Sequence, residues 1–348
     1  MPTPAKGYAA VAADKPLAPF DFQRRDLGPG DVKIEILYCG VCHSDIHTAR
    51  NEWGFTHYPI VPGHEIVGRV VEVGDSVTRF TLGDFAGIGC IVDSCRQCAP
   101  CDVGDEHYCE NRMTGTYGAP ERDGSGRITQ GGYANNYVID EHFALRISNK
   151  LNLAATAPLL CAGITTWSPL RHWKIGPGLK VGVVGLGGLG HMALKFAHAF
   201  GAEVTLFTRS EGKAEDARRL GADHVVLSSN KAMMRSLTGQ FDFIIDTVSA
   251  QHDVNSLLKL LRRDAVMCMV GMPDQPVMVN SFATAGRRGL TGSMIGGIKE
   301  TQEMLDFCAT HDITADIELI NIQEINEAFD RVVSSDVKYR FVIDMASL

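Results

Sequence analysis

The stretch Lys180-Val-Gly-Val-Val-Gly-Leu-Gly-Gly-Leu-Gly190, followed by His-Met-Ala-Leu-Lys-Phe-Ala-His-Ala-Phe200, decides the fold. Residues 180–184 predict a buried strand, and residues 191–200 predict a helix. Between them, the pattern G-x-G-x-x-G allows a tight turn and a close approach of the backbone to a ligand. The N-terminus of the helix then offers N–H groups and its dipole to a pyrophosphate. This context favours dinucleotide binding over a turn that serves only helix–sheet packing, with the binding residues Gly185, Gly187, Gly188, Leu189 and Gly190.

Strands and helices alternate on the C-terminal side of this turn. Apolar runs at 203–208, 224–228, 241–248 and 265–271 predict strands, and residues 213–221 predict a second helix. Apolar strands that alternate with helices are typical of βαβ units around a parallel sheet. We therefore predict a doubly wound α/β domain over residues 151–287.

The rest of the chain has a different rhythm. Residues 32–40, 65–74 and 85–89 are short β-branched runs separated by turns, and residues 126–140 continue this pattern. They predict an irregular, mostly β domain. After residue 288 the pattern is mixed again and ends in the strand-like run 339–344, which could return to that domain. We therefore predict a discontinuous domain made of residues 1–150 and 288–348.

Composition limits the classes of function. The 348 residues are 45% hydrophobic and 21% charged, which is ordinary for a globular protein of two domains. The formal net charge of −8 argues against a nucleic-acid or membrane-surface partner. Residues 1–17 contain no long apolar run, so neither a signal peptide nor a membrane span is predicted. Ten cysteines without such a signal favour reduced thiols and metal ligation in the cytoplasm over a disulfide framework.

Four cysteines share one short loop: Cys95, Cys98, Cys101 and Cys109. The spacing C-x2-C-x2-C-x7-C matches a closed, tetrahedral zinc site. At this density and spacing, the alternative of four unrelated thiols is weaker. The loop is acidic overall and has no basic stripe, so a nucleic-acid-binding zinc module is not favoured.

A second possible metal site has mixed ligands: Cys42, His64, Glu65 and Cys161. Two thiolates and one imidazole leave a fourth position for water or substrate, and Glu65 could fill that position at rest. Cys161 considered alone would be a buried apolar cysteine. Cys39 and Cys42 form C-x-x-C, but a redox pair is not favoured because the setting is not thioredoxin-like.

The residues after the second predicted strand of the α/β domain indicate the cofactor type. An acidic residue there would bind the ribose 2′-OH of NAD, whereas this chain has Thr208, Arg209 and Ser210. Guanidinium and hydroxyl groups complement a 2′-phosphate, and Lys213 could add charge. The alternative is that Arg209 is a solvated surface residue. We predict a preference for NADP(H).

Several motifs at independent positions closely resemble those of the zinc-dependent medium-chain alcohol dehydrogenases. They are Cys-His-Ser-Asp-Ile-His at 42–47, the string G-H-E-x2-G-x5-G-x2-V ending at Val77, the four-cysteine loop and the glycine-rich turn. Residues 51–55, 62–65, 158–165 and 292–297 resemble the cinnamyl alcohol dehydrogenase group and its bacterial broad-range, NADPH-dependent aldehyde reductase relatives. The resemblance covers essentially the whole chain.

The resemblance implies a GroES-like catalytic domain, a Rossmann cofactor domain and two zinc ions per chain, with the active site in the cleft. Catalytic zinc would bind Cys42, His64 and Cys161 with Glu65 as an exchangeable neighbour, and structural zinc would bind the four-cysteine loop. Further implied roles fall on five residues. Ser44 would hydrogen-bond the reacting oxygen and pass its proton through the cofactor ribose toward His47. Asp45 would orient His64. Thr165 would belong to the cofactor-binding residues, and Arg340 would contact the cofactor phosphates or Glu65.

The implied reaction is hydride transfer between NADP(H) and a primary alcohol/aldehyde pair, favouring reduction of aromatic or medium-chain aldehydes. Zinc would act as the Lewis acid. Trp53, Phe55 and Trp167 are candidates for an apolar substrate pocket, although ordinary core packing explains them equally well. The family expectation for the assembly is a homodimer.

Three other functions compete with this one. An NAD-dependent polyol dehydrogenase of the same superfamily would carry an acidic residue in place of Thr208-Arg209-Ser210. A zinc-independent double-bond reductase on the same fold would lack the complete set of Cys42, His64 and Cys161. A catalytically silent, NADPH-binding zinc protein would have lost Ser44 or a zinc ligand. Ser44, Cys42, His64 and Cys161 are all present, and residues 208–210 include no acidic residue, so a zinc-dependent, NADP(H)-using enzyme is favoured.

Overall fold

The computed structural model describes residues 3–273 and 275–348, which form two compact units. Unit 1 ends at Ile164 and resumes at Gly296, and unit 2 spans Thr165–Ile295. Both boundaries lie later along the chain than the sequence predicts. Residues 151–164 belong to unit 1 because α3 (Leu153–Thr156) and η2 (Ala157–Leu160) pack against its strands. Residues 288–295 belong to unit 2 because they supply its last strand, β15 (Gly289–Gly292).

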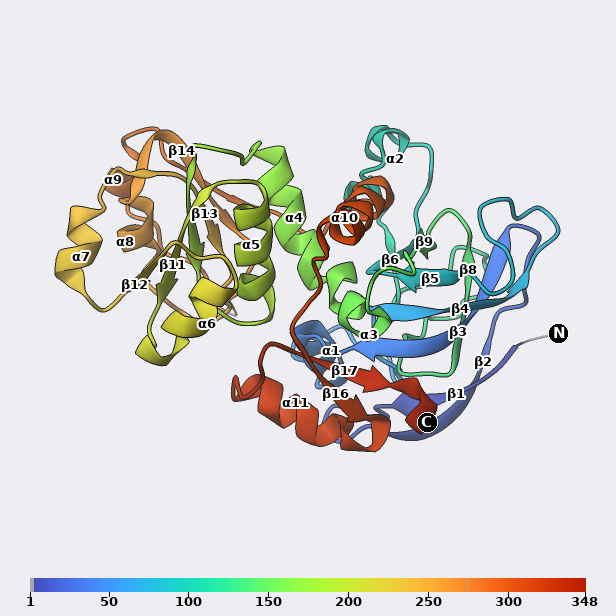
Figure 1. Cartoon of the computed structure of the whole chain (residues 1–348). Coiled ribbons are helices and arrows are strands. Elements are labelled where there is room, and N and C mark those ends of the chain that lie inside the picture. The colour runs from blue at the N-terminus through green and yellow to red at the C-terminus, as the bar shows by residue number, and fades with distance from the viewer. Residues whose placement is uncertain (1–2, 274) are drawn as a thin grey trace. The chain divides into compact units, whose positions relative to one another are not determined.

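Unit 1 is built around a mixed sheet in the order β16-β17-β3-β4-β5-β9, with β8 also paired to β3. These strands are β3 (Asp31–Gly40), β4 (Ile66–Val73), β5 (Phe85–Ile88), β8 (Asn136–Asp140), β9 (Leu145–Arg146), β16 (Ile317–Asn321) and β17 (Arg340–Asp344). β17 pairs antiparallel with β3, so the last strand of the chain lies beside one of the first (Figure 1). The predicted return of the C-terminal run to the first domain is thus observed.

Along the first part of β3, buried side chains alternate with less buried ones. Val32, Ile34 and Ile36 point to one face and are buried. Burying each such side chain contributes about 1.5–3 kcal/mol. On β17 the three residues 341–343 are all buried, as expected for a strand covered on both faces.

Shorter elements complete unit 1. The strand pairs are β1 (Thr3–Ala9) with β2 (Ala18–Arg24) and β6 (Ile91–Asp93) with β7 (Thr114–Gly115). The helices are α1 (His43–Ala49), α2 (Ala99–Val103), η1 (Glu106–Tyr108), α10 (Ile298–His311), η4 (Ile322–Glu324), α11 (Ile325–Val333) and η5 (Met345–Ser347). Within the predicted β run 126–140, only 136–140 form a regular strand. The preceding Gly131 and Gly132 pack so closely on residues 62–66 that a Cβ at either would lie 2.3 Å from a neighbouring atom.

Unit 2 is a parallel sheet in the order β12-β11-β10-β13-β14-β15. Its strands are β10 (Lys180–Val184), β11 (Glu203–Thr208), β12 (His224–Leu227), β13 (Phe241–Asp246), β14 (Leu261–Met269) and β15. Its helices are α4 (Ala162–His172), which crosses the unit boundary, α5 (Gly188–Ala199), η3 (Glu211–Lys213), α6 (Ala214–Arg219), α7 (Lys231–Ser236), α8 (Val254–Leu258) and α9 (Ser281–Thr284). In Figure 1, α4 and α5 lie on one side of the sheet and α7 on the other.

The strand order of unit 2 reverses at β10, whose neighbours are β11 and β13. In open α/β sheets, ligands bind at such a switch point, outside the carboxyl ends of the strands. The predicted doubly wound fold is confirmed, and the glycine-rich turn lies at the switch point because it directly follows β10.

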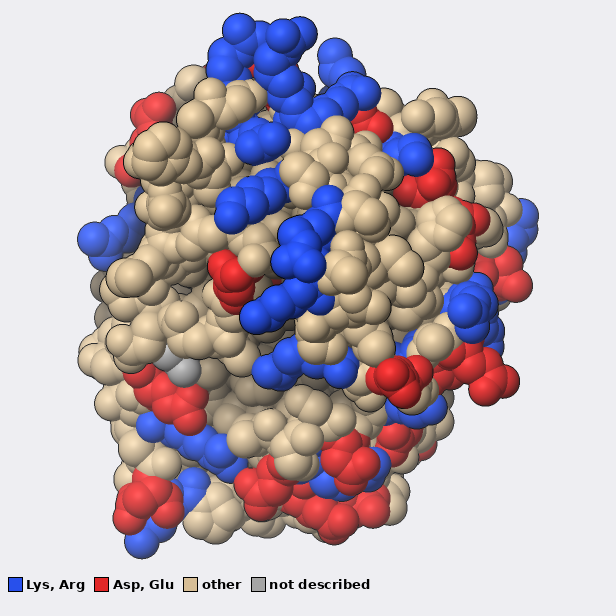
Figure 2. Space-filling view, turned by 90° about the vertical axis from the view of Figure 1, so that its left-hand side faces the viewer, with Lys and Arg blue, Asp and Glu red and all other residues tan. Residues whose placement is uncertain are grey.

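Two surface properties bear on function. On the face of the molecule in Figure 2, Lys and Arg side chains run down the middle while Asp and Glu gather below and to one side. Elsewhere in the described chain, exposed arginines pair with carboxylates, as Arg287 does with Asp264 and Arg262 with Asp242. Among the described residues, no single helix is long and apolar enough to cross a membrane. One bent pair, Leu153–Leu160 with Ala162–His172, meets the criterion by length and composition, and most of its residues are buried.

Candidate active site

Four ligand-bearing side chains of unit 1 meet in one buried cluster: Cys42, His64, Glu65 and Cys161. Their ligand atoms all lie within 4.8 Å of one another, and the Sγ atoms of the two cysteines are 3.9 Å apart. Two thiolates on one tetrahedral zinc would be about 3.8 Å apart, because each Zn–S bond is about 2.3 Å long. The donor set and its spacing therefore fit a zinc ion with an exchangeable position.

Strand pairing brings these residues together. Cys42 is the N-cap of α1, just after β3, and His64 and Glu65 immediately precede β4. β3 and β4 are antiparallel, so the end of one lies beside the start of the other. Gly63 makes this approach possible with φ +102°, and a Cβ there would come 2.6 Å from the Tyr133 ring.

Asp45 supports the cluster from the first turn of α1. Its fully buried carboxylate accepts the N–H groups of Cys42 (2.9 Å) and Gly63 (3.0 Å) and the hydroxyl of Tyr133 (3.0 Å). It also lies 3.0 Å from Nδ1 of His64. Because Nδ1–H donates to this carboxylate, Nε2 remains as the metal-binding nitrogen. This geometry is what the predicted role of Asp45 requires.

Protons are shared among the buried ligands. A hydrogen bond from the Cys161 thiol lowers the pKa of Cys42 well below its ordinary value, although burial opposes this. The same hydrogen bond raises the pKa of Cys161. Burial lowers the pKa of His64, but the charges of Asp45 and Cys90, together with hydrogen bonds to Asp45 and Cys42, outweigh it, so that pKa is raised overall. The cluster thus forms a thiolate readily, as a metal ligand must.

Arg340 from β17 reaches the cluster and forms a buried ion pair with Oε1 of Glu65. Of the two contacts expected for Arg340, the structure contains this one. Burial raises the pKa of Glu65 to about 7, while the Arg340 charge opposes the rise. Oε2 of Glu65 has no hydrogen-bond partner among the described residues. A buried, unpartnered carboxylate oxygen beside two thiols and an imidazole fits an exchangeable metal ligand.

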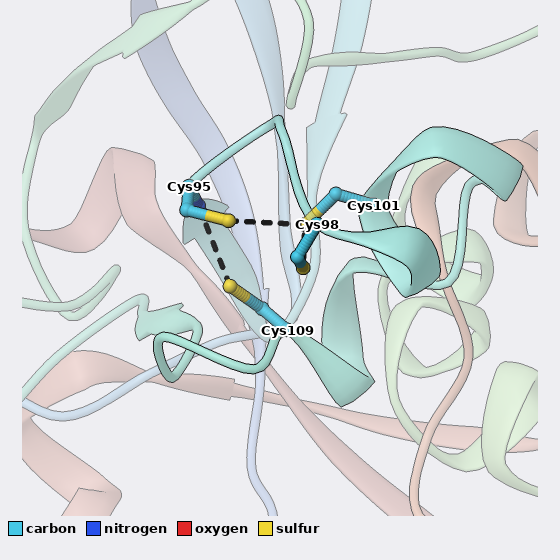
Figure 3. Close-up of side chains that lie close together, drawn as sticks. All are labelled: Cys95, Cys98, Cys101 and Cys109. Carbon is cyan, nitrogen blue, oxygen red and sulfur yellow. Dashed lines mark hydrogen bonds between the residues drawn. The ribbon is translucent and has the colours of Figure 1, made fainter.

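The four cysteines of the second predicted site converge as well (Figure 3). Their sulfurs lie within 4.8 Å of one another, with Cys98 and Cys101 3.4 Å apart. Backbone N–H groups point at two of them, from Cys95 to Cys109 and from Glu110 to Cys98, each at 3.4 Å. Such N–H groups stabilise thiolates, so the loop fits a closed zinc site with four sulfur ligands.

The predicted proton-transfer residues lie on α1. Ser44 is in its first turn and His47 in its last. Nδ1 of His47 contacts the carboxylate of Glu52, a residue that the sequence analysis did not select. This contact leaves Nε2 of His47 to exchange a proton.

Two of the three predicted pocket aromatics extend from the same place. The ring of Trp53 lies 5.1 Å from that of His47 and 5.8 Å from that of Phe55. Trp53 and Phe55 are large side chains with exposed fractions of 43% and 65%, respectively. Trp167 differs, because it is buried in unit 2 and packs edge-on against Phe196 and Phe200. This placement matches the core-packing alternative for Trp167.

The glycine-rich turn of unit 2 has the form that a dinucleotide requires. Gly185 has φ +89°, and a Cβ on Gly190 would lie 2.2 Å from the Gly185 carbonyl oxygen, so both positions need glycine. Gly187, the N-cap of α5, is different: a Cβ there would meet nothing within 4 Å. Neither packing nor backbone conformation within the chain explains this glycine, whereas close approach of a pyrophosphate does. Gly188 and Leu189 begin the helix.

The end of β11 lies beside this turn, because the Gly185 N–H donates to the Phe207 carbonyl (2.9 Å). Thr208 is buried, while Arg209 and Ser210 are exposed. Lys213 reaches back and donates from Nζ to the Leu186 carbonyl (2.7 Å). The predicted phosphate-binding group thus lies at the edge of the turn. Thr165 is a buried residue of α4.

Some residues at these sites were missed by sequence reasoning. Tyr133 and Tyr117 lie within hydrogen-bond distance of Asp45 and His64, respectively. Burial raises the pKa of both phenols, and the Asp45 charge adds to this, so both stay protonated donors. No local pattern marks either tyrosine. For Glu52, the spacing His47-x4-Glu52 was a usable signal, because a carboxylate shortly after a helix can reach back to its last turn.

Comparison with known proteins agrees with both units. The model of the alcohol dehydrogenase GroES-like domain matches residues 28–149, and that of the zinc-binding dehydrogenase matches residues 188–310. The chain belongs to the zinc-binding alcohol dehydrogenase family. This dehydrogenase has the GroES-like and Rossmann-like parts that its sequence predicts.

Relatives match this dehydrogenase over nearly its whole length. Aldehyde reductase YahK of Escherichia coli is 56% identical, covering 99% of each chain. NADP-dependent alcohol dehydrogenase C 1 of Mycolicibacterium smegmatis is 54% identical, covering 98% of each. Mannitol dehydrogenase of Petroselinum crispum is 54% identical, covering 95% of this chain and 98% of the relative.

Solved structures agree in fold. A cinnamyl alcohol dehydrogenase from Sorghum bicolor superposes with a TM-score of 0.96 at 44% identity, covering 99% of this chain and 98% of the other. The cinnamyl alcohol dehydrogenase of Helicobacter pylori, solved with NADP(H), gives 0.93 at 42% identity and 99% coverage of each.

Proposed function

We propose that this dehydrogenase transfers hydride between NADP(H) and a primary alcohol/aldehyde pair, and that it mainly reduces aromatic or medium-chain aldehydes. The observation that carries the proposal is the buried cluster of Cys42, His64 and Cys161, which leaves one exchangeable position beside Glu65. The names of its relatives support it, since they include an aldehyde reductase and an NADP-dependent alcohol dehydrogenase.

When bound, zinc would supply Lewis-acid polarisation of the carbonyl oxygen, and NADPH would supply the hydride. The chain positions these groups and handles the proton. Asp45 holds His64 with Nε2 free for the metal. Ser44 is proposed to give its hydroxyl proton to the reduced oxygen, and His47 to replace that proton by way of the cofactor ribose. Glu52 positions the His47 ring by holding Nδ1.

The preference for NADP(H) is proposed from the end of β11. Thr208, Arg209 and Ser210 offer donors to a 2′-phosphate and place no carboxylate where the 2′-OH of NAD would bind. Lys213 adds a second cation, held at the turn by the Leu186 carbonyl. The alternative function, an NAD-dependent polyol dehydrogenase, is supported by the relative named mannitol dehydrogenase. Against this alternative, the chain has no acidic residue at the end of β11 to bind the ribose 2′-OH of NAD.

Oxidation of NADPH, followed by absorbance with a panel of aldehydes, tests the function directly. Turnover should be fastest with aromatic and medium-chain aldehydes, slower with NADH, and lost after chelation of the metal. Alcohol oxidation with NAD and mannitol is the matched assay for the alternative. If mannitol oxidation with NAD is faster than aldehyde reduction with NADPH, the polyol dehydrogenase alternative is favoured instead. If no carbonyl is turned over, a catalytically silent NADPH-binding protein is favoured.

We further propose that the active form is a homodimer built through unit 2. β15 is an edge strand of its sheet, and in the described part of the chain no strand pairs with its outer side. Exposed strand edges favour pairing with another chain. The segment just before β15 carries Met278 and Phe282, exposed at 84% and 85%. Light scattering should give twice the 37.8 kDa chain mass, and Phe282→Asp should weaken the dimer; a monomer would refute this.

A reducing compartment such as the cytoplasm is proposed from the same chemistry. All ten cysteines are free thiols in the structure, and the six that belong to the two metal clusters would have to stay reduced to serve as ligands. Cell fractionation with an antibody to the chain would test this.

A further inference from the structure

An ion pair between a buried carboxylate and a half-buried imidazole lies at the edge of the glycine-rich turn and has no role in the steps above. Asp246, the last residue of β13, is fully buried, and its Oδ2 lies 2.8 Å from Nε2 of His252. The other ring nitrogen, Nδ1, lies 2.9 Å from the Ala250 carbonyl oxygen. Both partners are acceptors, so the geometry favours the imidazolium, in which both nitrogens donate.

This pair closes the loop 247–252, which forms one wall of the turn. The Thr247 hydroxyl donates to the Val184 carbonyl (2.7 Å), and the Val248 N–H donates to Oδ1 of Asp246 (3.1 Å). The wall is tight, because a Cβ on Gly185 would lie 2.7 Å from Cγ2 of Val248. His252 thus fixes the far end of a loop that packs directly on the predicted pyrophosphate site.

The order of the strands brings a second cation, Arg209, to the same edge of the sheet as His252. β11 and β13 flank β10, so Arg209 and His252 follow the carboxyl ends of the two neighbouring strands. Asp246 and Arg209 are the charged groups that act on the ring. The Asp246 hydrogen bond raises the pKa of His252, burial lowers it, and the Arg209 guanidinium lowers it further. Lys213, the remaining cation of this edge, is turned to the Leu186 carbonyl.

We propose that His252 is a specificity-determining positioning residue, which favours a cofactor with a 2′-phosphate only while its imidazole is protonated. Loss of the proton leaves the buried charge of Asp246 unbalanced near Arg209 and removes one of the two N–H donors that hold the loop. Both changes weaken binding of a dianion. NAD carries no such phosphate and is affected only by the looser loop. The inference rests on the NADP(H) preference proposed above.

Isothermal titration calorimetry of the zinc-loaded protein with NADP⁺ and with NAD⁺, from pH 7 to 9.5, tests this inference. Ionic strength is held constant because salt screens the interaction. The second ionisation of a phosphate has a pKa of about 6, so the 2′-phosphate changes charge little in this range. The ratio of the two affinities in the unmodified protein should fall about three- to tenfold as His252 loses its proton.

Three variants separate charge from structure. His252→Gln should show a low ratio without this pH dependence, and His252→Lys, a permanent cation, should keep a higher ratio up to pH 9. His224→Gln is the matched control, since His224 also faces a carboxylate (Glu203, 3.1 Å) but at the amino end of β12. It should behave as the unmodified protein. Calorimetry in two buffers of different ionisation enthalpy should also detect proton uptake with NADP⁺, which needs no variant.

The outcomes are distinct. A pH-dependent ratio that survives in His252→Gln would overturn the inference, as would an equal loss of both affinities at every pH, which indicates a merely structural role. Absence of any NADP⁺ preference in the unmodified protein at pH 7 would overturn the proposed cofactor instead, and the inference with it.

Discussion

Replacing Asp45 with Asn tests how one buried carboxylate holds the metal-binding geometry. Four groups converge on that side chain: two backbone N–H groups, the Tyr133 hydroxyl and Nδ1 of His64. Asn offers one oxygen and one NH₂ in place of two oxygens, so at least one buried donor must face another donor. Such a mismatch costs about 1–3 kcal/mol of folding free energy.

The effect on the metal should be separable from this loss of stability. Removing the carboxylate that orients a ligating histidine typically lowers metal affinity about 10- to 100-fold, or about 1.4 to 2.8 kcal/mol. Zinc release against a series of chelator concentrations measures this shift. One of the two zinc ions of Asp45→Asn should leave at chelator concentrations about 10- to 100-fold lower than in the unmodified protein, and the ion of the four-cysteine loop should not shift.

Two controls sharpen the result. Asp84→Asn changes an exposed carboxylate of the same unit that accepts from the N–H and the hydroxyl of Thr81, far in sequence from the ligands, so it should leave zinc release unchanged. Tyr133→Phe removes one donor and leaves Asp45 in place, so it should shift release by less than Asp45→Asn. If Asp45→Asn melts at the original temperature and releases both ions at the original concentrations, the hydrogen-bond argument is refuted.

Four further predictions follow from the same geometry. Cys101→Ser should reduce the zinc content from two ions per chain to one and lower the melting temperature, because a closed site contributes folding energy; metal analysis showing two ions would contradict it. Gly40→Ala should destabilise the chain by about 1–3 kcal/mol in urea titration, because the new Cβ would lie 1.9 Å from Oε2 of Glu65, whereas Gly30→Ala, with its nearest side-chain atom at 3.9 Å, should not. Arg209→Asp should lower the ratio of kcat/KM for NADPH to that for NADH at least tenfold, and an unchanged ratio would count against the phosphate site. Finally, the raised pKa of His252 means that its ion pair stabilises the fold fully below the unfolded pKa of about 6.5. This contribution is lost as pH rises through the folded pKa, so the difference in melting temperature between the unmodified protein and His252→Gln should shrink with rising pH.

The predictable parts of this protein are those in which structure follows from neighbours in sequence. The glycine-rich turn could be located because its strand, glycines and helix are consecutive, and the four-cysteine loop because all its ligands fall between residues 95 and 109. The prediction of the domain boundaries was less accurate, and the reason is physical. Composition changes near Leu151, but the chain must still carry Cys161 to Cys42, so residues up to Ile164 stay with unit 1.

What local sequence could not reveal is how each buried charge is balanced. Arg340 lies 275 residues from Glu65, and its neighbours Tyr339 and Phe341 suggest only a strand. The register of β17 on β3 brings it to the metal cluster. Asp45 depends likewise on Tyr133, 88 residues away, and Asp246 on a histidine whose spacing fits no motif. A buried ion needs a partner at a fixed position in space, and any element that passes close enough can supply it. The ligands of a site can therefore be identified from motifs. Of the groups that set their charge and orientation, Asp45 and Arg340 were expected only through the family resemblance, and Tyr133 emerges only from the packed fold.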